Sequence, residues 1–189
     1  MTLQDDKVLS LDAVGSRLEE ARLLGKTVVL SHGVFDLLHP GHLRHFAAAK
    51  KLGDVLVVTL TADSFVGKGP GRPAFDQQLR CESLAMLSTV DFVAVVDDAT
   101  AVPAISAIRP DVFLKGQEYA NEEDDPTGNI RIERELVERF GGRIAFSDDL
   151  VFSSSQLINN FLPQHPGETQ GWIRGLLGNF GIEEILEWL

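Results

Sequence analysis

Short apolar runs alternate with helical patterns along most of the chain, and this alternation most constrains the fold. The runs are rich in β-branched residues and predict buried parallel strands over Thr27–Leu30, Val55–Leu60, Phe92–Val96, Val112–Leu114 and Arg143–Phe146. Helical spacing predicts helices over Leu11–Leu24, after Pro40, and over Asp76–Ser88, Ala101–Ile108 and Ile130–Phe140. We therefore expect an α/β fold with a doubly wound, mainly parallel five-stranded sheet. Ligands of such sheets bind beyond the carboxyl ends of the strands.

Residues that are typical of helix ends support the same predicted helices. Ser10 and Asp76 stand where N-caps are expected, and Pro40 suits a first helical turn. Gly141 and Gly142 are expected to end the last predicted helix.

Composition excludes several classes of protein. Of 189 residues, only Cys81 is a cysteine, so an internal disulfide framework is excluded. No apolar run approaches the ~18 residues of a membrane span. The N-terminal stretch MTLQDDKVLS has two acidic residues where a signal peptide begins with basic ones, which predicts a cytoplasmic protein with no membrane partner.

The net charge of -11 is unevenly placed along the chain. Seven Lys and Arg outnumber four Asp within residues 26–80, so this segment carries +3 and the remainder carries −14. An acidic chain of this kind is not expected to bind nucleic acid through its overall charge. The positive segment predicts a small local site for an anion.

Two histidines follow the first predicted strand. His39 and His42 flank Pro40-Gly41, where a helix is expected to begin, and a helix N-terminus favours phosphate. Gly33 and Gly41 allow the backbone to approach a ligand closely. Two alternatives are ordinary loop histidines and a zinc pair, although the spacing lacks the glutamate of a zincin helix.

The stretch Gly33-Val-Phe-Asp-Leu-Leu-His39-Pro-Gly-His42 resembles the GxFDxxHxGH signature of the cytidylyltransferase-like nucleotidyltransferases. The likeness continues through Ala49–Asp54, the helix with Arg80, Pro110–Gly116 and Phe152–Ile158, and it covers about residues 26–162. The most similar members are the adenylyltransferase domain that forms ADP-heptose and the glycerol-3-phosphate cytidylyltransferases. The Lys68–Pro73 stretch and the C-terminal tail also resemble those of nucleotidyltransferase domains that precede a sugar-kinase domain in longer chains.

This resemblance implies a reaction and a set of site residues. A phosphate oxygen of the acceptor attacks the α-phosphorus of a nucleoside triphosphate, which carries Mg²⁺, and pyrophosphate leaves. No dedicated protein metal site is expected. The implied catalytic residues are His39, His42, Lys68 and Arg80. The implied nucleotide-binding residues are Gly33, Val34, Phe35, Asp36, Gly41, Asp63, Arg72, Lys115, Gly116, Ser153, Ser154 and Ser155.

Each of these residues has a structural alternative. Phe35 could be an ordinary aromatic residue of the core, and Arg80 could be the partner in an ion pair. Asp63 could cap the following segment. Lys68 and Arg72 also suit an exposed loop, and one serine of 153–155 suits a helix N-cap.

Substrate choice rests on the resemblance and on one departure from it. The glycerol-phosphate enzymes carry an arginine shortly before the final serine element, whereas Ser147–Phe152 is acidic here. This departure weakens glycerol phosphate as the acceptor and leaves a sugar phosphate preferred. The resemblance to the heptose-type domain implies a slight preference for ATP over CTP. The alternatives are a CTP-dependent enzyme for a polyol or phosphonate and a non-catalytic nucleotide-binding module. An oxidoreductase or P-loop kinase is disfavoured because the GxGxxG and GxxxxGK[ST] motifs are missing, and a synthetase because no KMSKS-like run occurs.

Three regions are predicted along the chain. Residues 1–25 form a helical lead-in, 26–162 the nucleotidyltransferase domain, and 163–189 a linker with an apolar helical tail. The apolar tail and the resemblance predict a homo-oligomer, or contact with a sugar-kinase domain in a longer chain.

Overall fold

A computed structural model of the chain describes residues 6–69, 71–120 and 128–147. Five strands form one sheet in the order β3-β2-β1-β4-β5, and every pairing is parallel. The strands are β1 (Val28–Gly33), β2 (Val55–Thr61), β3 (Phe92–Val96), β4 (Val112–Gly116) and β5 (Arg143–Ser147). The predicted parallel five-stranded sheet is confirmed.

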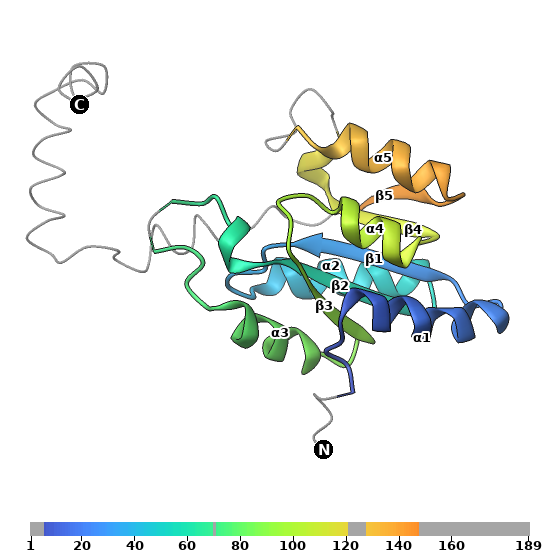
Figure 1. Cartoon of the computed structure of the whole chain (residues 1–189), viewed down its shortest axis with the longest axis horizontal. Coiled ribbons are helices and arrows are strands. Elements are labelled where there is room, and N and C mark those ends of the chain that lie inside the picture. Colours follow the sequence, from blue (N-terminus) through green and yellow to red (C-terminus); the bar gives the residue numbers. More distant parts are fainter. Residues whose placement is uncertain (1–5, 70, 121–127, 148–189) are drawn as a thin grey trace, which may run out of the picture. The chain divides into compact units, whose positions relative to one another are not determined.

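Helices cover both faces of this sheet (Figure 1). They are α1 (Leu11–Leu23), α2 (Pro40–Leu52), α3 (Gln77–Ala85), α4 (Val102–Ile108) and α5 (Ile130–Arg139), with 3₁₀ turns η1 (Asp63–Phe65) and η2 (Gln117–Tyr119). One apolar cluster joins α1, α4 and α5 to the sheet, and a second joins α2 and α3 to its other face. The domain is therefore doubly wound, as predicted.

Local chemistry explains where the helices begin and end. The Ser10 side chain accepts a hydrogen bond from the Ala13 amide, and the Asp76 side chain accepts one from the Leu79 amide, so both predicted N-caps are confirmed. Past the end of α5, Gly141 has a φ of 84°, and a Cβ on Gly142 would stand 2.2 Å from the Pro110 carbonyl oxygen. Both positions therefore favour glycine.

The sheet centre explains the apolar runs of the sequence. All seven residues of β2 are buried, because helices cover both of its faces. The predicted N-terminal lead-in contributes to the same core, since Val14 and Leu18 of α1 are fully buried. In the part of the chain that the structure describes, no helix is long and apolar enough to cross a membrane. The predicted linker and tail, 163–189, lie outside the described residues.

Candidate active site

The two signature histidines lie at the start of α2, beyond the carboxyl end of β1. His39 occupies the N-cap position and Pro40 begins the helix, as predicted. The imidazole rings of His39 and His42 are stacked, with centroids 3.8 Å apart. The amide groups of the first helical turn and two imidazoles thus converge on one place, an arrangement that suits a phosphate.

Both histidines favour the neutral form in the free protein. Burial lowers the pKa of His39, which is 6% exposed. Burial, followed by the charges of His39, His45 and Lys68, lowers the pKa of His42 to about 3. The Nδ1 atom of His42 is buried and has no hydrogen-bond partner among the described residues. A bound polyphosphate would supply the missing partner and the negative charge that favours protonation.

The loop from β1 to α2 shapes the floor of this site. Phe35 has a left-handed backbone with φ of 49°, and its buried ring meets the edge of His42 at a centroid distance of 5.2 Å. The ring also packs against Phe46 of α2. A Cβ on Gly33 would lie 3.2 Å from the Phe35 ring, so glycine lets the ring pack close to β1. Phe35 is therefore a core aromatic that supports His42, the structural alternative expected for it.

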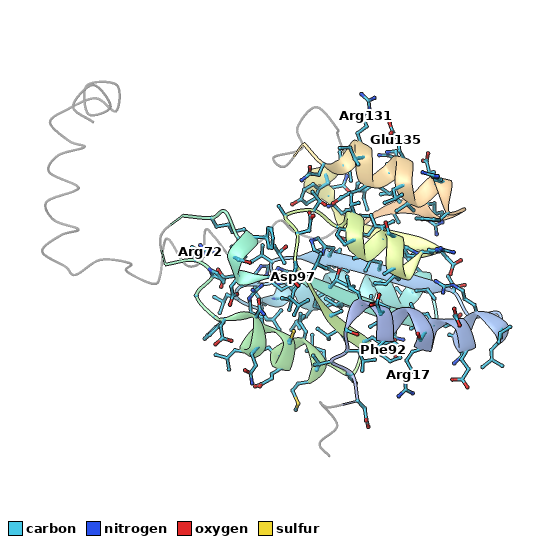
Figure 2. All side chains as sticks on the ribbon, in the orientation of Figure 1. Arg17, Arg72, Phe92, Asp97, Arg131 and Glu135 are labelled. Atoms are coloured by element: carbon cyan, nitrogen blue, oxygen red, sulfur yellow. The ribbon has the colours of Figure 1, made fainter. Side chains whose placement is uncertain are left out.

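Asp36 anchors the glycine-rich loop between β2 and α3. Its carboxylate, 2% exposed, accepts hydrogen bonds from Arg72 Nε and the Ala74 amide, both at 2.6 Å. Figure 2 labels Arg72 on this loop. Two predicted nucleotide-binding residues are thus brought together and engage each other. Their ion pair holds the loop against the β1–α2 connection.

Arg80 of α3 ties three backbone segments together. Its guanidinium is buried and donates to the carbonyl oxygens of Val34, Thr61 and Phe75 at 2.6–3.0 Å. It also pairs with Asp63 at 2.5 Å. Most of its donors are therefore used within the protein, and Arg80 fixes the ends of β1 and β2 relative to α3.

Asp63 has a second role at the start of α3. Its carboxylate accepts a hydrogen bond from the Gln77 amide at 3.0 Å, and the Gln77 side chain accepts one from the Asp63 amide at 3.1 Å. Asp63 thus joins the end of β2 to α3, in agreement with its capping alternative.

Lys68 is the exposed cation of the same loop. Partial loss of hydration, followed by the nearby positive charge of Arg72, lowers the pKa of Lys68. Its charge in turn acts on His42. Arg72 and Arg80 are paired with carboxylates, so Lys68 differs from both arginines in being exposed.

Lys115 and Gly116 end β4 at the same edge of the sheet. Lys115 is 7% exposed, donates to Glu133 at 2.8 Å and lies over the Tyr119 ring at 4.4 Å. The second Glu133 oxygen accepts a hydrogen bond from the Ala101 amide at 3.1 Å. A buried, neutralised ion pair thus joins β4, α5 and the start of α4. The predicted serines 153–155 lie outside the described residues.

The family model described as cytidylyltransferase-like matches residues 30–160. The chain belongs to this family. Among its relatives, the bifunctional protein HldE of Syntrophotalea carbinolica is 39% identical over 146 residues, which are 76% of this chain and 28% of that protein. The bifunctional protein HldE of Methylobacillus flagellatus is 41% identical over 147 residues, which are 77% and 29%. The chain thus spans less than a third of either relative.

Solved structures agree with the fold of this cytidylyltransferase-like domain. The lipopolysaccharide core biosynthesis protein from Thermoplasma volcanium has a TM-score of 0.55 and 26% identity, covering 67% of this chain and 100% of that one. Pantoate-beta-alanine ligase from Francisella tularensis has a TM-score of 0.58 at 14% identity, covering 81% of this chain and 72% of that one, and shows the fold alone.

Two further polar residues that make non-local contacts, His45 and Glu133, were not expected from the sequence. His45 of α2 is hydrogen-bonded to Ser31 at 2.8 Å and to Ser147 at 2.9 Å, and so connects α2 with β1 and β5. Glu133 is 2% exposed on the inner side of α5. Its spacing from the buried Ile130 and Val137 is the signal that could have revealed it.

His32 is expected to make the stability of this domain depend on pH. Burial lowers its pKa from 6.5 to about 3. Below about pH 6.5, His32 therefore binds a proton in the unfolded chain but stays neutral in the folded chain. The free energy of unfolding falls as the pH drops toward 3. Near pH 5 this effect lowers the free energy of unfolding by up to ~2 kcal/mol relative to its value near pH 7.

The variant His32→Gln, which stays neutral, should lose less stability than the wild type between about pH 7 and about pH 5. Urea unfolding followed by circular dichroism at each pH measures this difference. Parallel pH curves for the two proteins would show that His32 is not held neutral by the fold.

Proposed function

We propose that this chain is a nucleotidyltransferase that transfers a nucleoside monophosphate from a nucleoside triphosphate to a sugar phosphate and releases pyrophosphate. The observation that carries the proposal is the stacked His39–His42 pair at the N-terminus of α2, within the electrostatic reach of Lys68. The family match and the similarity to the bifunctional HldE proteins support it. Arg80 and the Asp36–Arg72 pair support the site by holding its loops in place.

The residues act on charge rather than through covalent chemistry. An acceptor phosphate oxygen forms a bond to the α-phosphorus, the bond to the bridging oxygen breaks, and negative charge grows on the departing pyrophosphate. His39 and His42 donate hydrogen bonds to the phosphoryl oxygens, and Lys68 and the α2 amides stabilise the same charge. Lys115 and Gly116, at the end of β4, are proposed to border the nucleotide.

Mg²⁺ is proposed to enter with the triphosphate, because its preferred ligands are phosphate oxygens and water. Among the described residues, no group of three His, Cys, Asp or Glu side chains is arranged to hold a metal ion. The Asp36 carboxylate already accepts from Arg72 and Ala74. When bound, the ion would neutralise charge on the triphosphate.

The finer proposals rest on the resemblance. ATP is preferred over CTP because the heptose-type adenylyltransferase domain is among the most similar members. The sequence supports a cytoplasmic location. The apolar segment 172–189 supports self-association or contact with a kinase domain in a longer chain, and light scattering of a chain ending near Phe161 would decide whether this segment drives association.

Pyrophosphate release with a panel of triphosphates and acceptors tests the function. We expect turnover with ATP and a sugar 1-phosphate, and a lower rate with CTP or glycerol 3-phosphate. Binding of magnesium-ATP by the folded protein without turnover on any acceptor would instead favour a nucleotide-binding module.

A further inference from the structure

A third histidine of α2, His45, has no part in the proposed phosphoryl chemistry. It follows His42 by three residues, so the two side chains are neighbours on the surface of the helix. The His45 ring is partly buried and meets the buried Phe46 ring edge to face, at a centroid distance of 5.8 Å. After burial and the charge of His39, the charge of His45 also lowers the pKa of His42. His45 therefore lies within electrostatic reach of the stacked pair without belonging to it.

Both ring nitrogens of His45 are hydrogen-bonded to serine hydroxyls of two different strands. Nε2 lies 2.8 Å from Ser31 Oγ, and Nδ1 lies 2.9 Å from Ser147 Oγ. Both serines are buried, at 0% and 5% exposure. A neutral imidazole offers one donor and one acceptor, and a hydroxyl can take either role. One ring thus satisfies two buried hydroxyls that would be costly to leave without a partner.

The two serines mark the centre and the edge of the sheet. Ser31 belongs to β1, where it pairs with Leu114 of β4. Ser147 ends β5 and pairs in register with Gly116, the last residue of β4. Its hydroxyl also donates to the Lys115 carbonyl oxygen at 3.5 Å, the outer limit of a hydrogen bond. His45 therefore joins the helix that carries His42 to the strand ends at which the nucleotide is proposed to lie.

We propose that His45 is a positioning residue that sets the spacing between the first turn of α2 and the nucleotide-binding edge at the ends of β4 and β5. The inference rests on the proposed function and adds a residue that touches neither substrate. A nucleoside triphosphate engages both places at once, so its affinity depends on the distance between them. Pyrophosphate or adenosine alone engages only one place, and its affinity does not depend on that distance.

Calorimetry with the whole nucleotide and with its two fragments tests this role. His45→Leu removes both hydrogen bonds and keeps an apolar contact with Phe46. We expect the affinity for magnesium-ATP to fall about tenfold, while the affinities for magnesium-pyrophosphate and for adenosine stay within about twofold. In turnover, KM for ATP should rise about tenfold and KM for the acceptor should stay within about twofold. Should CTP be the faster substrate, CTP and cytidine replace ATP and adenosine.

Two conservative variants separate the two hydrogen bonds. The amide of asparagine reaches the place of Nδ1, so His45→Asn should keep the bond to Ser147 and restore most of the ATP affinity. The amide of glutamine reaches the place of Nε2, so His45→Gln should keep the bond to Ser31 and bind ATP as weakly as His45→Leu. Ser147→Ala should also weaken ATP binding, and its effect should not add to that of His45→Leu.

Exposed residues away from this network supply the controls. Lys51→Ala near the end of α2 and Ser106→Ala on α4 should leave the ATP affinity unchanged. Urea unfolding of each variant reports its stability separately. A merely structural role for His45 would lower the free energy of unfolding without separating ATP from its fragments.

Several results would overturn the inference while leaving the proposed function intact. An equal loss for ATP and pyrophosphate would make His45 a phosphate ligand, and an equal loss for ATP and adenosine would make it a nucleoside ligand. Unchanged ATP affinity in His45→Leu, or restoration by His45→Gln that equals that by His45→Asn, would also remove the proposed role. If the wild type binds ATP but turns over no acceptor, the proposed function fails, and the same calorimetry still tests His45. A folded wild type that does not bind either triphosphate would overturn both.

Discussion

Alanine at either His39 or His42 is expected to reduce kcat for pyrophosphate release by about 10²–10³. Each imidazole donates to charge that develops as the phosphoryl group is transferred, and alanine leaves that charge unsolvated inside the site. Because the rings are stacked at 3.8 Å and act on the same group, the double variant should lose less than the product of the two single effects. Steady-state kinetics at saturating triphosphate measures the loss.

A control on the same helix separates chemistry from folding. Arg44 is exposed on α2, two residues after His42, and Arg44→Ala should change kcat by less than about twofold. All of these variants should keep the circular dichroism spectrum of the wild type, since neither histidine supplies much of the apolar core. Near-wild-type kcat in both histidine variants would remove them from the catalytic role.

The strand pattern was predictable from the sequence because burial on both faces requires continuous apolar runs. The predicted bounds of β3 agree with the structure, and those of β2 differ by one residue. β1 was predicted to end at Leu30, yet it continues through Ser31, His32 and Gly33, which pair with Val58–Leu60 of β2. Polar side chains interrupt the apolar signal, but backbone pairing with a central strand continues. For this reason the contacts of His32 with the hydroxyls of Thr59 and Thr61 were not predicted.

Some residues of the candidate site could likewise be predicted from the sequence, and others could not. His39 and His42 could be located because their motif is local and includes the proline that begins α2. The ion-pair partners of Asp36 and Lys115 could not be predicted. Arg72 reaches Asp36, and Glu133 reaches Lys115, only when the chain has folded. A residue type shows which charge is present, whereas non-local packing decides whether that charge faces a ligand or another side chain.

Glu133→Ala is expected to cost about 3–5 kcal/mol of unfolding free energy, the largest stability effect among these predictions. Glu133 and Lys115 are 2% and 7% exposed and lie 2.8 Å apart, so removing the carboxylate leaves a buried ammonium with no counter-ion among the described residues. The Ala101 amide at the start of α4 loses its acceptor as well. Urea unfolding of the full chain, followed by circular dichroism, measures the change.

The matched control lies on the same helix. Glu135 forms an exposed i,i+4 pair with Arg131, and Figure 2 shows both side chains on α5. Glu135→Ala should cost no more than about 0.5 kcal/mol, because water screens such a pair.

Replacing both buried partners, as in Glu133→Leu with Lys115→Met, should recover much of the loss since no unpaired charge remains. If Glu133→Ala proved as mild as Glu135→Ala, the pair would not hold β4 against α5. If the double variant were stable yet impaired in triphosphate KM, the Lys115 charge would be needed for the nucleotide rather than for the fold.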